Sequence, residues 1–238
     1  IRPGAVGGQN LLEPLLAKVT GEARTASQRF NERIARLYSK AWSADFLRTV
    51  LARSRRGEEA AEPWLCTEHE VGVAVDTLEG ALEAIAAIRR RGHHRVAAKE
   101  AHGLAGHNAI RLWEPEVLAA QQRWLAHALQ DGRQVVIEPW LERELDFSVQ
   151  LEMGPRSLKL CGYTGLINDP KGQFQANWAA ANYDRRIPAN VAVLFGEPTG
   201  IAGRLQRLYG DILSLLEAEL QRAGFVGPVS IDAFVYRT

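Results

Sequence analysis

Cysteine is scarce in this chain. Only Cys66 and Cys161 occur among the 238 residues, and they lie far apart. That number and spacing exclude a disulfide framework and a cysteine-based zinc site. We expect two buried free thiols in a reducing compartment.

Long apolar runs are also lacking, because no stretch approaches the roughly 18 residues of a membrane helix. The first residues do not have the pattern of a secretory signal. The sequence therefore predicts a cytoplasmic protein with no membrane partner. The chain opens on Ile1 rather than methionine and closes on Thr238 directly after a strand pattern, so we expect a longer protein cut at both ends.

An excess of charge of one sign is missing as well. The 29 basic and 28 acidic side chains leave a net charge of +1. No overall field then draws the protein toward nucleic acid or a membrane, and we expect neither as a partner. Any anion must be bound by a local site. Hydrophobic residues at 46% and charged residues at 24% are typical of a globular protein.

Helix-like and strand-like patterns are mixed along the chain. Leu, Ala, Arg and Glu dominate residues 11–56, and the apolar spacing of residues 201–223 predicts an amphipathic helix. Residues 146–152 and 157–163 alternate around turn chemistry, which predicts a hairpin. We expect an α+β fold. The richness of residues 165–200 in Gly, Asn, Pro and Asp predicts a long loop.

The sharpest motif is a lysine that ends a predicted strand and is followed by a glycine-bearing loop, Val96-Ala-Ala-Lys99-Glu-Ala-His-Gly103-Leu-Ala-Gly106-His107-Asn108. Glycines let backbone N–H groups approach an anion, and the lysine adds a point charge for phosphate. The pattern is neither a P-loop nor a dinucleotide fingerprint. Taken alone it also fits an ordinary hairpin with a surface lysine.

Two further segments place a carboxylate at the end or in the middle of an apolar strand. Val135-Val-Ile-Glu138-Pro-Trp140-Leu141 runs into an apolar hinge that can offer backbone groups to a purine edge. In Gly227-Pro-Val-Ser-Ile-Asp232-Ala-Phe-Val235 an aspartate interrupts an apolar run. A carboxylate there is costly to bury unless it is paired or binds a metal, and Mg²⁺ takes one or two carboxylates plus phosphate oxygens. Charged strand ends and edge-strand aspartates facing water remain the plain alternatives.

The order of these motifs resembles that of the ATP-grasp superfamily over roughly residues 35 to 238. The resemblance implies an α+β ATP-grasp fold of two lobes with the nucleotide site between them. It divides the chain into a helical segment of an upstream domain (1–63), a small lobe (64–137) and a large lobe incomplete at its C-terminal end (138–238).

The resemblance also implies a role for particular residues. Lys99 matches the lysine that contacts the phosphates, and Lys40, less closely, matches an earlier basic residue that also reaches phosphate. The mobile loop that closes over the phosphates corresponds to Gly103, Gly106, His107 and Asn108. The adenine-binding hinge corresponds to Glu138, Trp140 and Leu141.

Two acidic residues complete the implied site. Asp146 matches the residue that binds the ribose hydroxyls, and Asp232 matches the first metal-binding carboxylate. The Glu-x-Asn strand that such enzymes usually carry next does not follow within this sequence.

The implied activity is that of an ADP-forming carboxylate–amine ligase. It would use ATP and Mg²⁺ to activate a small-molecule carboxylate as an acyl phosphate for attack by an amine or similar nucleophile. A kinase of the same fold and a nucleotide-binding protein without turnover remain the alternatives.

Overall fold

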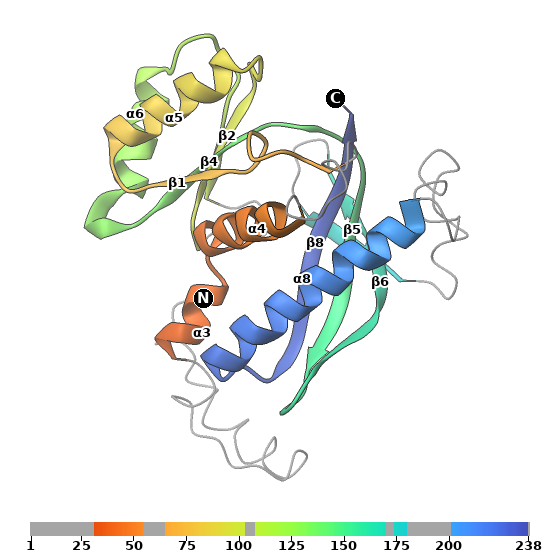
Figure 1. Cartoon of the computed structure of the whole chain (residues 1–238). Coiled ribbons are helices and arrows are strands. Elements are labelled where there is room, and N and C mark those ends of the chain that lie inside the picture. The colour runs from red at the N-terminus through yellow and green to blue at the C-terminus, as the bar shows by residue number, and fades with distance from the viewer. Residues whose placement is uncertain (1–30, 55–64, 103–107, 170–173, 180–200, 238) are drawn as a thin grey trace.

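The computed structural model describes residues 31–54, 65–102, 108–169, 174–179 and 201–237, and shows two four-stranded antiparallel sheets with helices packed on them (Figure 1). The elements in chain order are α3 (Glu32–Leu37), α4 (Lys40–Ser54), β1 (Val73–Val75), α5 (Leu78–Arg90), β2 (Val96–Glu100), β3 (Ala109–Leu112), α6 (Ala119–Ala128), the 3-10 turn η1 (Gln130–Gly132), β4 (Val135–Pro139), β5 (Glu142–Met153), β6 (Leu158–Asn168), β7 (Phe174–Trp178), α8 (Ile201–Ala223) and β8 (Gly227–Arg237).

The small lobe, as we name β1 to β4 with α5 and α6, has the strand order β1-β4-β2-β3. Helix α5 begins where the Thr77 hydroxyl accepts a hydrogen bond from the Gly80 amide at 3.1 Å. It ends before Gly92, whose φ of +96° suits a residue without a Cβ. One face of the sheet is covered by α5 and α6 through fully buried side chains such as Ile85, Leu125 and Ile137.

The large lobe, β5 to β8 with α8, has the strand order β7-β6-β5-β8. Strands β5 and β8 pair along nearly their whole length, from Glu142 opposite Arg237 to Met153 opposite Gly227. Successive side chains alternate between the two faces of a strand. Phe147, Val149, Leu151 and Met153 therefore share the face that packs with Tyr209, Leu216 and Leu220 of α8. Each such buried side chain contributes roughly 1.5–3 kcal/mol of hydrophobic stabilisation.

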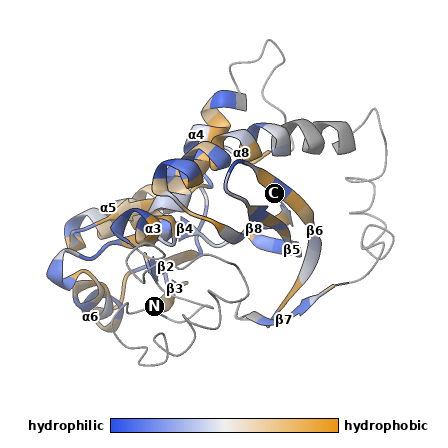
Figure 2. Cartoon of the chain, turned by 90° about the horizontal axis from the view of Figure 1, so that it is seen from below, coloured by the Kyte–Doolittle hydropathy of each residue, from blue (hydrophilic) through white to orange (hydrophobic). Residues whose placement is uncertain are grey.

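Helix α4 packs against both lobes. Trp42 and Phe46, stacked with ring centroids 5.1 Å apart, join the large-lobe core beside α8. Ala41 packs with Val136 and Ala101 of the small lobe. Figure 2 shows α4 and α8 on the same side of the second sheet, with hydrophobic and hydrophilic residues mixed along them. The helix is thus a shared structural element of the two lobes.

Among the helices that the structure describes, none combines the length and the apolar character needed to cross a membrane. The division of the chain at residues 63/64 and 137/138 stays a prediction. The first sheet ends at Pro139, and the second begins at Glu142.

Candidate functional site

The face of the small-lobe sheet opposite α5 and α6 carries the motif residues. In the strand register, Lys99 lies opposite Val136, and Ala97 lies between Glu138 and Arg111. Because side chains alternate along a strand, the odd-numbered residues of β2 point away from the apolar core formed by Val96 and Ala98. We call this surface the open face of the small lobe.

An ion pair joins the lysine and glutamate motifs on the open face. The Lys99 ammonium contacts the Glu138 carboxylate, and both side chains are about one-quarter exposed. They are diagonal neighbours on adjacent strands, within reach of long side chains. Two motifs separated by 38 intervening residues are therefore brought together.

Lys40 joins this pair from the first residue of α4. Its ammonium lies 3.4 Å from the Glu100 carbonyl oxygen, and its backbone N–H donates to the Ala101 carbonyl at 2.7 Å. Burial lowers the pKa of Lys40 from its ordinary value of 10.5. The nearby Lys99 lowers it further, whereas Glu138 and Glu100 act in the opposite direction. Lys40, which matches the family pattern less closely than Lys99, therefore lies close to the Lys99–Glu138 ion pair.

The N-terminus of α4 adds positive potential at the same point. Ser39 ends the preceding turn, and its buried hydroxyl accepts a hydrogen bond from the Ala41 amide at 3.2 Å. A helix N-terminus carries partial positive charge and favours anions. A lysine as its first residue is electrostatically unfavourable, and the first turn of α4 contains no acidic residue to compensate. The arrangement thus favours an added anion.

The loop after Lys99 is only partly within the described residues, which include Asn108 but not Gly103, Gly106 and His107. Asn108 has a φ of +57°, a left-handed conformation that asparagine tolerates. Its side-chain amide donates to the Glu100 carboxylate at 3.1 Å, and its carbonyl accepts from the Glu100 amide at 3.0 Å. Asn108 thus closes the base of the β2–β3 loop.

Two tryptophans and two arginines extend the open face beyond Ala97. The Arg111 guanidinium carbon lies 5.3 Å from the Trp113 ring centroid and 5.1 Å from that of Trp140. Arg95 lies 5.1 Å from the Trp113 ring. The Trp140 amide donates to the Arg95 carbonyl at 2.9 Å. The Trp140 N–H is therefore already bonded. Among the predicted hinge groups, the Trp140 carbonyl and the backbone N–H and carbonyl of Leu141 are left as candidates for contacting a base.

The two predicted acidic residues of the large lobe lie together on the polar face of the second sheet. Asp232 is opposite Ser148, and Asp146 is opposite Phe234. Arg143 donates to the Asp146 carboxylate at 2.9 Å and places its guanidinium carbon 4.3 Å from the Phe234 ring centroid. Asp232 is exposed. The structure therefore brings Lys40 of α4 together with Lys99 and Glu138 of the first sheet, and places Asp146 and Asp232 on the second sheet.

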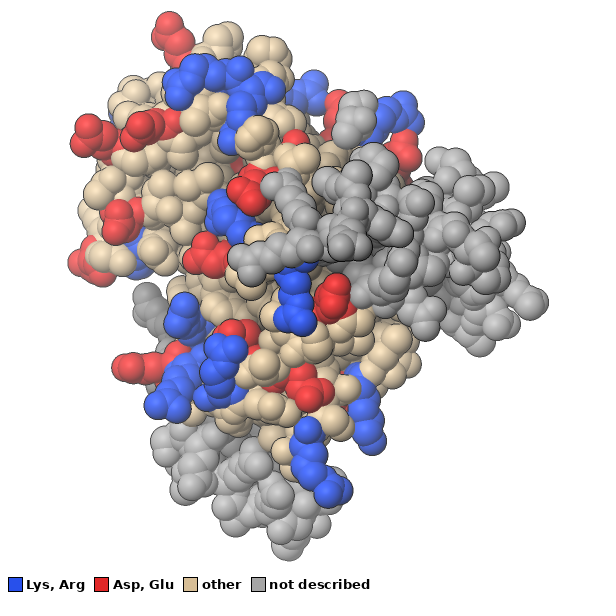
Figure 3. Space-filling model, viewed as in Figure 1, with Lys and Arg blue, Asp and Glu red and all other residues tan. Residues whose placement is uncertain are grey.

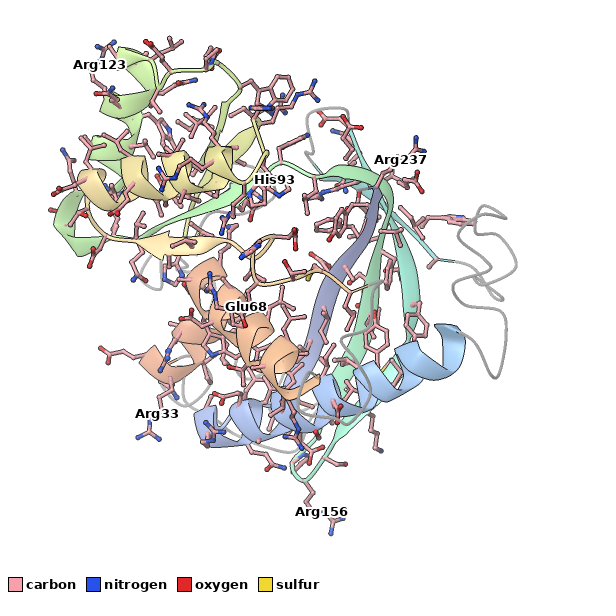
Figure 4. The ribbon with its side chains drawn as sticks, turned by 45° about the horizontal axis from the view of Figure 1, so that its top comes forward. Arg33, Glu68, His93, Arg123, Arg156 and Arg237 are labelled. Atoms are coloured by element: carbon pink, nitrogen blue, oxygen red, sulfur yellow. The ribbon has the colours of Figure 1, made fainter. Side chains whose placement is uncertain are left out.

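Contacts near the hinge join the two lobes. Arg95 donates to the Glu142 carboxylate at 3.5 Å, which connects the start of β2 to the start of β5. Burial, followed by the charge of Glu70 and the nearby Cys66, raises the pKa of Tyr236 on β8 to about 12. Glu70 also lies 3.9 Å from His93, which Figure 4 shows between the lobes. On the face seen in Figure 3, acidic and basic side chains are intermixed.

The described residues contain no group of three His, Cys, Asp or Glu side chains that could hold a metal ion. The Asp232 carboxylate is exposed, whereas that of Asp146 is engaged with Arg143. Mg²⁺ at nucleotide sites is held by one or two carboxylates together with phosphate oxygens. The residues present therefore fit a magnesium ion held mainly by a nucleotide, with Asp232 as the protein ligand.

Sequence reasoning missed Arg95, Arg111 and Trp113. By the alternation of side chains along each strand, all three lie on the same face of the sheet as Lys99 and Glu138. The only signal in the sequence was the alternation Arg95-x-Ala97-x-Lys99 and Arg111-x-Trp113. It predicts a shared face only when the pairing of the two strands is known.

The sequence matches no known protein-family model and no curated protein sequence. Similarity appears in the fold. Over 94% of this chain, the structure of carboxyaminoimidazole ribonucleotide synthase from Aspergillus clavatus, complexed with ATP, is similar with a TM-score of 0.50 at 12% identity. The ADP complex of PurK, an N5-carboxyaminoimidazole ribonucleotide synthetase, is similar over 87% with a TM-score of 0.51 at 14% identity. The biotin carboxylase–β-γ-ATP complex from Campylobacter jejuni is similar over 86% of this chain, with a TM-score of 0.50 at 14% identity.

These three proteins are ATP-grasp enzymes, and the chain has the ATP-grasp fold. The α+β class and the fold expected from the order of motifs are therefore confirmed. The chain corresponds to 47%, 43% and 41% of the lengths of the three similar chains, so it spans less than half of each.

Proposed function

We propose that this chain binds Mg²⁺-ATP between its lobes and uses it to activate a carboxylate as an acyl phosphate, which an amine or similar nucleophile then attacks. The observation that carries the proposal is the meeting of two ammonium groups, Lys40 and Lys99, at the N-terminus of α4.

The electrostatics of that meeting point favour a polyphosphate ligand. The Lys99 ammonium acts on that of Lys40 as a like charge, and partial burial strengthens such repulsion. One carboxylate, Glu138, pairs directly with Lys99, and the Glu100 carboxylate is engaged by Asn108. A bound triphosphate would bring further oxyanions to both ammonium groups, close to the positive end of the helix dipole.

The other end of the open face is suited to the base. An ionised carboxylate only accepts hydrogen bonds, so Glu138 favours a base edge that donates, such as the exocyclic amine of adenine. Glu138 lies directly beside Ala97 of the neighbouring strand β2. Glu138 would accept a hydrogen bond from that amine in this proposal.

The chemistry then needs positioning and charge stabilisation more than a protein nucleophile. A carboxylate oxygen of the substrate attacks the γ-phosphorus, the bond from that phosphorus to the β–γ bridging oxygen breaks, and ADP leaves. Lys40 and Lys99 hold the phosphates in line and stabilise the developing negative charge. When bound at Asp232, Mg²⁺ supplies further neutralisation of phosphate charge. The nucleophile then attacks the acyl carbon, and inorganic phosphate leaves.

Thermal unfolding with and without Mg²⁺-ATP tests the nucleotide site. A ligand at 100 times its Kd stabilises the folded state by about 2.7 kcal/mol, which raises the melting temperature. Lys99→Ala should abolish the rise. Lys159→Ala is the matched control and should keep it, because Lys159 is an exposed lysine on β6 of the other lobe. Absence of any rise for the unsubstituted chain at millimolar nucleotide would contradict the proposal.

Product analysis separates ligase from kinase. With a panel of carboxylates and hydroxylamine as the nucleophile, a ligase releases inorganic phosphate and forms a hydroxamate. A kinase yields ADP and a stable phosphorylated product. Formation of ADP and a stable phosphorylated product, without hydroxamate, would replace the ligase reaction with phosphoryl transfer at the same nucleotide site.

A further inference from the structure

The open face of the small lobe has a regular layout around Ala97. Glu138 and Arg111 lie on either side of Ala97, and Lys99 follows two residues along the strand. Two residues before Ala97 is Arg95, whose carbonyl accepts from the Trp140 amide. Ala97 is therefore surrounded by charged and aromatic side chains, although its own side chain is a single methyl group.

Arg111 and Trp140 together span strand β2 above Ala97. β3 and β4 lie on opposite sides of β2, so their backbones are about 9.5 Å apart. The guanidinium carbon of Arg111 on β3 nevertheless lies 5.1 Å from the ring of Trp140, which follows β4. Ala97 is only 2% exposed, consistent with side chains lying over it.

We infer that Arg111, held between Trp113 and Trp140, is the platform on which the nucleotide base stacks; this inference rests on the proposed function. The guanidinium is planar and stacks on aromatic faces, which a lysine ammonium cannot do in the same way. The two tryptophan contacts, at 5.3 and 5.1 Å, fix the position of the guanidinium over the open face.

The position of Arg111 matches the base rather than the phosphates. Lys99 lies two residues along β2 from Ala97, a distance of about 7 Å along the strand. A nucleotide whose phosphates contact Lys99 and Lys40 therefore places its base near Ala97, beside Glu138. There the carboxylate reads the edge of the base, and the guanidinium supports its face.

The test compares a ligand that has a base with one that has none. Binding of Mg²⁺-ATP and of Mg²⁺-tripolyphosphate to the whole chain is measured by titration calorimetry. Arg111→Ala should weaken ATP binding about tenfold, which lies between the scales of an exposed and of a desolvated cation–π contact. It should leave tripolyphosphate binding within about twofold of its original value, since Lys40 and Lys99 are unchanged.

Two further variants make the result decisive. Arg111→Lys keeps the charge but loses the plane, so it should show most of the loss on ATP and almost none on tripolyphosphate, including if Arg111→Ala does not fold. Arg123→Ala is the matched control, because Arg123 is exposed on α6 and projects away from the sheet in Figure 4. It should bind both ligands normally.

The outcomes separate the two proposals. If the unsubstituted chain binds neither ligand, the proposed function fails. If it binds ATP and the Arg111 variants bind ATP equally well, the platform is overturned while the nucleotide site stands. Equal weakening of both ligands would make Arg111 a phosphate contact and would also overturn the inference.

Discussion

A single methyl group at Gly72 should disturb the small lobe measurably. Gly72 is buried just before β1, and a Cβ built there would lie 2.6 Å from Val136 Cγ1 and 3.3 Å from Glu138 Cβ. The first separation is well below ordinary van der Waals contact of 3.4–4 Å. Val136 is 2% exposed and packs with Ala41 and Ala101, so its stiff side chain has little space to move.

The expected magnitude follows from that overlap. Inserting a methyl group into a well-packed core costs about 1–3 kcal/mol, and the reduced freedom of the unfolded chain returns about 0.4–1 kcal/mol. Gly72→Ala should therefore lower the free energy of unfolding by about 1–2 kcal/mol. Val136→Ala should lower it by about 1–3 kcal/mol, because it removes two buried methyl groups and leaves a cavity.

The double variant makes the test specific. In the Gly72→Ala, Val136→Ala chain the new methyl group occupies space that Val136 has vacated, so the combined loss should be smaller than the sum by at least about 1 kcal/mol. Urea unfolding followed by circular dichroism measures all three variants. Gly210→Ala is the control of opposite sign. It is exposed within α8 with nothing within 4 Å, and should stabilise by about 0.5–1 kcal/mol.

Strict additivity of the two substitutions would refute the close approach of residue 72 to β4. So would a Gly72→Ala variant as stable as the original chain.

Three other predictions concern the site and its support. The pKa of Lys40 is lowered, so as the pH rises its ammonium loses its proton earlier than an ordinary lysine, whose pKa is 10.5. Calorimetry across alkaline pH should therefore show nucleotide affinity falling before pH 10.5 is reached. Lys40→Arg, which stays charged, should flatten that fall. An unchanged slope would exclude Lys40 as the titrating group. Glu138→Gln should weaken ATP binding about tenfold in calorimetry, since a hydrogen bond to a charged acceptor is replaced by one to a neutral amide; an unaltered ATP affinity would argue against Glu138 reading the base. Arg89 donates to the carbonyls of Leu112, Glu114 and Pro115 at 3.2, 2.5 and 2.7 Å. Arg89→Lys should therefore cost about 1–2 kcal/mol in urea unfolding, whereas Arg90→Lys at the exposed neighbour should be nearly neutral.

Elements with strong local periodicity were predictable from the sequence. The amphipathic pattern of residues 201–223 predicts α8 at Ile201–Ala223, and the alternating residues 146–152 and 157–163 predict the β5–β6 hairpin, whose strands extend beyond those bounds. The loop expected over residues 165–200 is wrong in part. β6 continues to Asn168, and β7 at Phe174–Trp178 pairs with it, because a polar edge strand is defined by its partner more than by its own alternation.

Tertiary contacts also decide where α6 begins. Proline is favoured as the first residue of a helix, so Pro115 is a candidate start in the sequence, but α6 begins at Ala119, where the Gln121 side chain accepts from the Leu118 amide at 2.9 Å. The carbonyl of Pro115 is instead bound by Arg89 from α5, a contact that local sequence does not encode.

The site divides in the same way. Lys99 and Glu138 could be selected because each ends an apolar strand, and the order of motifs supported both. Their ion pair follows from a strand register that no local pattern contains. The role proposed for Arg111 depends on the same register, on Trp113 just after its own strand, and on Trp140 after β4 on the far side of β2.

The placement of α4 has a mechanical consequence. Lys40, its first residue, lies near Lys99, and Ala41 packs against the small-lobe sheet. Trp42 and Phe46 pack into the large-lobe core beside α8. A ligand bound to the Lys40 ammonium therefore also restrains α4 and, through it, α8 on the large-lobe sheet. Slower amide hydrogen exchange in α8, far from any phosphate, would then report that a ligand is bound at Lys40 and Lys99.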